Sequence, residues 1–479
     1  MKRKVIQYLM IIGGLITVTA MAITYTNTAF SSGGLNTGGP VILPVNTNGV
    51  VSMSGELVQD KVLYGADGIV TLAVTVSAGS VKPELTGNEK SVDMVIVLDR
   101  SGSMSGEKIE HAKSAILRLI DKLSDRDRFS IVAYSDGAQR YTGLIPVSPR
   151  NRRLIENAVN RIAARGGTNL GAGLNEGLTL LTSADSSGAI KKLMLISDGL
   201  ANRGIVDVHS LGNMASQAPE HNIDMTTVGV GLDFNEQLMA HIADRGSGNF
   251  HFMENPDAFA SVFERDYRHT MQTAANNLSF QIPLPLGVTL TDAGGYPITE
   301  RNGLACFRAG NLLSGQTRKF FLTFKVPTDR TIKYQFKDIR VEYTANGNKQ
   351  LAFLPGTFHL ACVKDQADVM ASIHRDEWAE KVIMSDYNQL KEEVSADIKA
   401  GKPQAAMEKI ETYREAQSTV NQIMRSSRVQ QNIEKELVGL GLLVEETFDG
   451  EPEAVQAKQK LNSKLLQYEG YQGRRAKQE

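Results

Sequence analysis

Three short stretches of the 479-residue sequence contain the residue types that bind hard metal ions. In the first, DRSGSM, Asp99, Ser101 and Ser103 supply one carboxylate and two hydroxyls. Thr168 in GGTN adds a third hydroxyl, and Asp198 in SDG adds a second carboxylate. Mg²⁺ prefers about six oxygen ligands in an octahedral array. These five side chains are therefore candidate ligands, some of them through water.

Two buried strands are predicted to bring these stretches together. Residues 94–98 form a continuous apolar run that ends directly before Asp99, and residues 193–196 form another that ends just before the SDG stretch. Such runs are typical of strands buried on both faces of a parallel sheet. Because ligands bind beyond the carboxyl ends of such strands, we expect the oxygen-bearing side chains to meet at one edge.

The surrounding sequence alternates between strand and helix signals. Residues 129–134 and 225–230 read as further strands, a short strand is expected at 249–253, and apolar spacings of three and four indicate helices between them. This alternation predicts a doubly wound α/β domain over residues 89–275.

The combined set resembles the metal-ion-dependent adhesion site of von Willebrand factor A (VWA) domains, whose pattern is Asp-x-Ser-x-Ser, a later Thr and a later Asp. Asp99, Ser101, Ser103, Thr168 and Asp198 match it in order, and the resemblance covers about residues 91–272. It implies a Rossmann-like fold and a bound Mg²⁺, with Mn²⁺ and Ca²⁺ as alternatives. It also implies that the hydroxyls bind directly and the two aspartates largely through water.

A simpler interpretation is that Asp99 and Ser103 merely cap the helix that begins near Glu107. It accounts for one loop, but not for the presence of Thr168 and Asp198 as well. The resemblance further implies that an acidic side chain of a protein partner fills an open position on the metal.

Enzymatic motifs are missing from the sequence. There is no P-loop and no His-Glu-x-x-His motif, Gly229 and Gly231 lack the third glycine of a dinucleotide loop, and Met104 stands where a hydrolase elbow needs serine. With 52 Lys and Arg against 53 Asp and Glu, no basic excess favours nucleic acid. We expect a binding protein and not an enzyme.

The α/β region is flanked by β-rich sequence on both sides. Residues 51–88 and 276–363 show strand signals, and 51–88 offers only about three strands. We therefore predict one β-sandwich into which the α/β domain is inserted, the alternative being two separate β modules. Residues 364–468 are predicted to form a C-terminal α-helical region, read most simply as a helical hairpin, and 469–479 a flexible tail.

The N-terminal residues predict export. Residues 1–26 combine a basic start, an uncharged apolar body and a small-x-small pattern, as in a signal peptide, or alternatively an uncleaved N-terminal anchor. Residues 27–50 read as a linker, and no other stretch is apolar enough to cross a membrane. We expect an extracytoplasmic protein, in the periplasm, cell envelope or medium. There Cys306 and Cys362 are expected to form a disulfide, the alternative being two separate buried thiols.

The predicted function is adhesion or envelope assembly through a protein partner that supplies a carboxylate to the metal. The order of regions looks like that of bacterial secreted A-domain proteins. Two alternatives remain open: a structural envelope or surface-fibre component, and a non-catalytic subunit of a metal-handling enzyme complex, as in metal chelatases.

Overall fold

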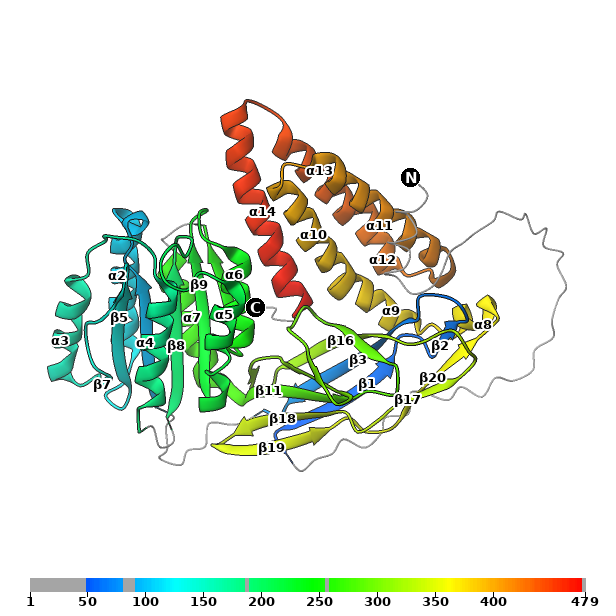
Figure 1. Ribbon diagram of the computed structural model, residues 1–479, viewed down its shortest axis with the longest axis horizontal. Helices are drawn as coiled ribbons and strands as arrows, with labels where there is room; N and C mark the ends of the chain where they lie inside the picture. The colour runs from blue at the N-terminus through cyan, green and yellow to red at the C-terminus, as the bar shows by residue number, and fades with distance from the viewer. Residues whose placement is uncertain (1–48, 81–90, 186–188, 255–257, 476–479) are drawn as a thin grey trace.

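The computed structural model describes residues 49–80, 91–185, 189–254 and 258–475. An α/β domain, a group of mostly antiparallel sheets and a group of helices lie next to one another (Figure 1). The predicted signal peptide or anchor, and nearly all of the predicted linker, lie outside the described residues.

The α/β domain is built on a sheet of strand order β10-β9-β8-β4-β5-β6, with β7 also paired to β5. Its main strands are parallel, and in the central strand β4 every residue is buried, as its continuous apolar run predicts. The strands are β4 (Val92–Asp99), β5 (Arg128–Tyr134), β6 (Ala138–Arg140), β7 (Ile145–Pro146), β8 (Ile190–Ser197), β9 (Ile223–Val230) and β10 (Phe250–Met253).

Helices cover both faces of this sheet, so the doubly wound prediction is confirmed (Figure 1). Successive β4 side chains serve opposite faces: Ile96 packs with helices α2, α3 and α7, and Val97 packs with α4, α5 and α6. The helices are α2 (Glu107–Lys122), α3 (Pro149–Asn160), α4 (Leu170–Thr182), α5 (Val208–Ala215), α6 (Glu236–Arg245) and α7 (Phe259–Gln272).

The α/β domain ends slightly earlier than the sequence suggests. Helix α7 ends at Gln272, and strand β11 (Thr273–Pro283) begins at the next residue. Residues 273–275, which we assigned to the α/β domain, therefore belong to a strand of the β region. The residues directly after Gln272, TAANN, include no glycine or proline that would mark the change.

The two flanking β segments pair with each other. Strands β1 (Val51–Leu57) and β3 (Ile69–Ala78) from the first segment share a sheet with β16 (Thr317–Lys325) and β12 (Thr289–Ala293), in the order β1-β3-β16-β12. Val74 of β3 lies opposite Phe320 of β16 in an antiparallel ladder. Two residues far apart in the chain, Val74 and Phe280, belong to one apolar cluster.

Two further sheets complete the β region. One has the order β13-β14-β11-β18-β19, with β15 also on β11, and the other has the order β17-β20-β2. Their strands are β2 (Lys61–Leu63), β13 (Thr299–Arg301), β14 (Leu304–Arg308), β15 (Leu312–Leu313), β17 (Lys333–Phe336), β18 (Arg340–Ala345), β19 (Asn348–Phe353) and β20 (Phe358–Val363).

The predicted disulfide is wrong, because both cysteines are free thiols. Cys306 lies on β14 and Cys362 on β20, strands that belong to different sheets. Burial raises the pKa of each thiol above its usual value, which keeps both protonated near neutrality.

The C-terminal region contains more helices than the hairpin we predicted. Two long helical stretches, each with a π-helical segment inside it, alternate with two straight helices. They are α9, η4 and α10 (Arg375–Lys381, Val382–Asp386, Tyr387–Lys399), α11 (Pro403–Met424), α12, η5 and α13 (Ser427–Gln431, Asn432–Glu436, Leu437–Phe448) and α14 (Pro452–Arg474), preceded by the short α8 (Gln366–Ala371). Helix α11 begins at Pro403, since proline is well suited to the first position of a helix.

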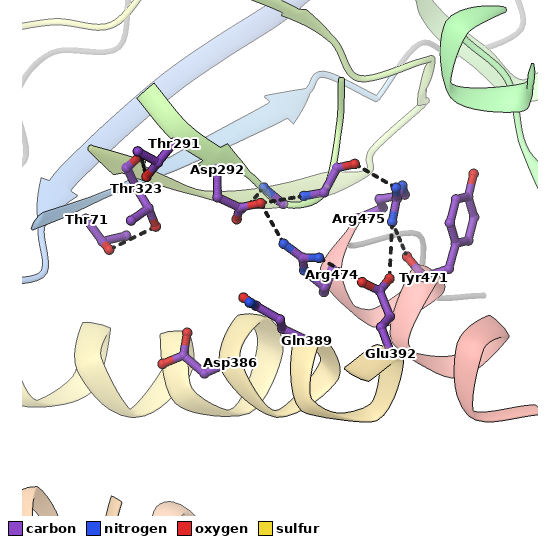
Figure 2. Close-up of polar contacts among 12 residues, drawn as sticks. Thr71, Thr291, Asp292, Thr323, Asp386, Gln389, Glu392, Tyr471, Arg474 and Arg475 are labelled. Atoms are coloured by element: carbon purple, nitrogen blue, oxygen red, sulfur yellow. Dashed lines mark hydrogen bonds and ion pairs between the residues drawn. The ribbon is translucent and has the colours of Figure 1, made fainter. Parts of the chain in front are cut away.

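The predicted flexible tail is also wrong for the residues that the structure describes. Helix α14 continues through residue 474, and Tyr471 and Arg475 are buried. Figure 2 shows the reason: Arg474 reaches Asp292 of β12 at 2.6 Å and Glu392 of α10 at 2.8 Å. Arg475 donates to Asp244 of α6 at 2.8 Å, so the end of α14 joins all three groups of elements.

Among the described residues, none of the helices combines the length and the apolar character that crossing a bilayer would require.

Candidate metal centre

Each of the five candidate residues stands where a strand or a loop reaches the same edge of the parallel sheet. Asp99 is the last residue of β4, and Asp198 directly follows β8, which is hydrogen-bonded to β4 along its length. Ser101 and Ser103 lie in the turn between β4 and α2, and Thr168 precedes α4. The predicted meeting of these stretches at one edge follows from the parallel pairing.

Hydrogen bonds join the hydroxyls to the second carboxylate. The Oγ atoms of Ser101 and Ser103 are 3.0 Å apart, and the Ser103 hydroxyl donates to Asp198 Oδ1 at 2.7 Å. Ser101 and Asp198 are buried, whereas Ser103 is exposed. The cluster therefore opens to solvent on the Ser103 side.

Thr168 lies close to the Ser103 hydroxyl, as the surroundings of Gly199 show. A Cβ atom placed on Gly199 would lie 3.4 Å from Ser103 Oγ and 3.5 Å from Thr168 Oγ1. The glycine thus leaves room between these two hydroxyls. Asn202 holds the Thr168 loop in place, since its Oδ1 accepts a hydrogen bond from the Thr168 backbone N–H at 2.9 Å.

Asp99 lies behind the hydroxyls and is fully buried. Its Oδ1 accepts from the Ser101 backbone N–H at 2.8 Å, and its Oδ2 accepts from the Ser197 hydroxyl at 2.8 Å. Burial raises the pKa of Asp99 to about 6, against the lowering effect of the hydrogen bonds from Ser101 and Ser197, and the charge of Asp198 raises it further. Both hydrogen bonds fix the orientation of this carboxylate.

Lys108 supplies a positive charge that the sequence analysis did not assign to the site. It lies on the first turn of α2, and its Nζ is 2.5 Å from Asp198 Oδ2. Gly231, at the end of β9, leaves room for this side chain: a Cβ there would lie 3.7 Å from Lys108 Nζ. Asp198 therefore has a cationic partner on one oxygen and a hydroxyl on the other.

The donor set fits a hard divalent cation. Three hydroxyls and two carboxylates face one small region, and all of them are oxygen ligands of the kind that Mg²⁺ prefers. Within the described residues, no group of three or more His, Cys, Asp or Glu side chains forms an alternative metal site. Ser101, Ser103 and Thr168 would hold the ion, with Asp99 and Asp198 as the charged groups behind it.

Ser197 and Lys108 are the contributors that sequence reasoning missed. Ser197 directly precedes Asp198, so its place at the strand end was available as a signal. Lys108 follows Ser103 by five positions, and only the direction in which α2 leaves the turn brings it to Asp198.

The α/β domain matches a known family. Residues 93–265 match the model of the von Willebrand factor type A domain. The uncharacterized protein YfbK of Escherichia coli is 31% identical over 207 residues, which are 43% of this chain and 36% of that protein. The human inter-alpha-trypsin inhibitor heavy chain H4 is 27% identical over 198 residues, 40% of this chain and 21% of that protein. This chain thus spans well under half the length of either relative.

Solved structures extend the likeness beyond this domain. A von Willebrand factor type A protein from Catenulispora acidiphila superposes with a TM-score of 0.64 at 19% identity, covering 89% of this chain and 97% of that one. The ArnB paralog VWA2 from Sulfolobus acidocaldarius gives 0.52 at 17% identity, covering 87% and 98%. At these identities the likeness shows the fold alone. Residues 93–265 of this chain therefore form a von Willebrand factor type A domain.

Proposed function

We propose that this chain is a non-catalytic binding protein whose VWA domain holds Mg²⁺ in order to bind an acidic group of a protein partner. The observation that carries the proposal is the convergence of three hydroxyls and two carboxylates at one open sheet edge. When bound, the ion would supply an electrophilic position for a carboxylate, because its neutral hydroxyl ligands leave much of its charge uncompensated.

The chain's own residues would divide the work of binding. The Ser103 hydroxyl lies on the open side, with the Ser101 hydroxyl 3.0 Å from it, while Asp99 is held from behind by Ser197 and the Ser101 backbone. This arrangement would orient the site before a partner arrives, which reduces the ordering cost of binding. VWA domains commonly mediate protein–protein interactions, and this supports the same reading.

The loop after Asp198 favours a protein partner over a free small acid. Leu200, Ile205 and Val206 are 57%, 45% and 50% exposed, and they follow Asp198 within eight residues. Exposed apolar side chains beside a polar centre are typical of surfaces that bind other proteins. A partner would then bring a carboxylate flanked by apolar side chains.

We also place this activity outside the cytoplasm. The basic start, the uncharged body and the small-x-small pattern in residues 1–26 support export. Cell fractionation followed by determination of the N-terminus of the exported chain would test this. A chain recovered only from the cytoplasm would contradict it.

Calorimetric titration with Mg²⁺ tests the site. We expect Asp198→Ala to weaken Mg²⁺ binding by about 10–100-fold, the range found when a group that orients metal ligands is removed. The matched control is Asp233→Ala. Asp233 is an exposed carboxylate in the loop between β9 and α6, outside the cluster, and its loss should leave Mg²⁺ affinity unchanged.

Circular dichroism would confirm that both variants keep the fold. If folded Asp198→Ala binds Mg²⁺ as tightly as the native chain, the metal centre is assigned to the wrong residues.

A further inference from the structure

A cavity of about 120 Å³ lies at the opposite edge of the parallel sheet from the candidate metal centre. Lys192 and Asp224 line it from the starts of β8 and β9, and Asp266 lines it from α7. Arg318 of β16 and Gln472 of α14 close the other sides. The cavity is therefore enclosed by the VWA domain, the β region and the last helix together.

The wall of this cavity carries an excess of positive charge. Three cationic side chains, Lys192, Arg265 and Arg318, line it against the two carboxylates of Asp224 and Asp266. Lys192 Nζ is 2.7 Å from Asp224 and 3.0 Å from Asp266, so both carboxylates are engaged by Lys192. Burial alone would raise the pKa of Asp266, but the charge of Lys192 lowers it overall. Asp266 is thus charged at neutral pH.

Arg318 has only neutral partners, although it is 3% exposed. Its Nη1 donates to the carbonyl oxygens of Ala309 and Asn311, and its Nη2 donates to the Tyr296 hydroxyl and the Arg475 carbonyl oxygen. Within the described part of the chain, its Nε has no hydrogen-bond partner and no carboxylate forms an ion pair with it. Burial of a cation without an anion is costly, and a bound anion would remove that cost.

Two other polar side chains of the wall make no hydrogen bond in the described part of the chain. The hydroxyl of Ser247, 1% exposed, and both ring nitrogens of His251, 6% exposed, make no hydrogen bond within the described residues. His251 Nε2 lies 3.8 Å from Asp266, too far for a hydrogen bond. Buried polar atoms are nearly always satisfied in folded proteins, so several unsatisfied groups around one cavity indicate a polar occupant.

We propose that this cavity binds one small oxyanion, of the size and charge of inorganic phosphate. Arginine and hydroxyl donors are common partners of such oxygens, and the excess positive charge matches an anion. The volume sets the upper limit, because pockets for drug-sized ligands have volumes of about 300 Å³ or more. The anion would be held between the VWA domain and the β region, and it would stabilise their contact.

Titration of the full chain with inorganic phosphate, followed by melting temperature and calorimetry, tests the site. The buffer contains a chelator, so that the metal centre is empty. Parallel titrations with sodium chloride and with sodium acetate are made at equal ionic strength. We expect saturable binding of phosphate and none of chloride. The titration with acetate distinguishes two kinds of site. A site for any small oxyanion binds both phosphate and acetate, whereas a site selective for tetrahedral oxyanions binds phosphate alone.

Two variants place the binding in this cavity. Arg318→Gln should raise the dissociation constant for phosphate at least about tenfold, the effect of losing a charge-assisted contact. Because Arg318 also holds neighbouring carbonyl groups, Ser247→Gly serves as a milder second variant. Ser247 has φ 56°, which glycine adopts freely, so the change removes little but the hydroxyl, and we expect a loss of about threefold to tenfold.

The matched control is Asn302→Gly, which alters another residue with positive φ, 52°, in an exposed turn outside the cavity. It should bind phosphate as the native chain does, and so should Asp198→Ala, because the site does not depend on the metal centre. The proposal is overturned if phosphate and acetate bind no better than chloride, or if the folded Arg318 and Ser247 variants keep the native affinity.

Discussion

Lys108 determines how much negative charge the candidate metal centre presents to an incoming ion. Its ammonium group lies 2.5 Å from Asp198 Oδ2, and the lysine side chain is 28% exposed while that of Asp198 is fully buried. A divalent cation near Ser103 would therefore share the Asp198 carboxylate with an ammonium group that is already there. The lysine also keeps this buried carboxylate paired when no metal is bound.

Replacing Lys108 should remove its competition with the metal for the Asp198 carboxylate. We expect Lys108→Gln to raise Mg²⁺ affinity by about threefold to tenfold, because a competing ion pair of about 1 kcal/mol is removed. The metal-free variant should melt at a lower temperature than the native chain, since Asp198 loses its partner. Calorimetry and melting curves with and without Mg²⁺ measure both effects.

Lys122→Gln is the matched control, as it removes an exposed lysine in the last turn of the same helix. If Lys108→Gln binds Mg²⁺ more weakly than the control, the lysine supports metal binding instead of competing with it.

The five candidate residues could be predicted from the sequence because each follows a strand or precedes a helix whose apolar pattern is clear. Asp99 and Asp198 end two runs of buried residues, and parallel pairing of those runs brings them together. The part played by Lys108 could not be predicted, because the apolar pattern of a sequence does not indicate how far a flexible side chain reaches across a turn.

At the scale of elements, helix α14 attaches the helical region to the VWA domain by two kinds of contact. Tyr468 and Tyr471 pack edge-to-face against Phe250 of β10, with ring centroids 5.7 and 5.5 Å away. At the end of the helix, the buried Arg475 pairs with Asp244 of α6. Earlier on the same helix, the exposed Lys460 pairs with Asp233 at 3.1 Å.

These two ion pairs should differ strongly in their contribution to stability. Arg475→Met leaves the buried carboxylate of Asp244 with the neutral Tyr471 hydroxyl but without the guanidinium that pairs with it, and we expect a loss of about 3–5 kcal/mol. Lys460→Met breaks an exposed pair on the same helix and should cost at most about 1 kcal/mol. Urea unfolding of the full chain, followed by circular dichroism, compares the two.

A loss in Arg475→Met no larger than that in Lys460→Met would show that the pair of Arg475 with Asp244 does not hold α14 to the VWA domain.

The end of α14 also shows where local sequence reasoning fails. Residues 469–475 contain two glycines and two arginines, a composition that predicts a loose terminus. Their order comes from partners far away in the chain: Asp244 is 231 positions from Arg475, and Asp292 is 182 positions from Arg474. No local pattern reports such contacts. Local sequence patterns likewise do not reveal the two π-helical segments, which lie inside amphipathic runs.

At the scale of the whole molecule, the two β segments behave as parts of one sheet system. Strand β3 lies between β1 and β16, so removal of residues 51–78 would expose a long edge of β16 and its share of the apolar cluster. That these segments fold as a single unit, with the VWA domain inserted between them, stays a prediction of the sequence. The pairing supports it.

Three separately expressed parts of the chain test the insertion. Residues 273–363 alone should aggregate, whereas residues 49–78 joined to 273–363 by a short Gly-Ser link should melt cooperatively, because the link restores the β3 and β16 ladder. Residues 91–272 should fold and bind Mg²⁺, but should melt below the same domain in the full chain. The reason is that Phe250 and Asp244 lose their partners on α14.

A soluble, cooperatively melting monomer of residues 273–363 would instead mean that the two β segments are separate modules. The candidate metal centre would be unaffected by that result, since all five of its residues lie within 91–272.

The direct passage from α7 into β11 has a mechanical consequence. Helix α7 returns from the metal-centre edge of the sheet and enters β11 at Thr273 without a linker. A partner that pulls on the metal centre would therefore place tension along β11, a strand held on both sides by β14 and β18. Inter-strand hydrogen bonds stand perpendicular to the strands, so such a load shears many of them at once instead of peeling them one by one. The joint between α7 and β11 would therefore resist a force that a bound partner applied at the metal-centre edge.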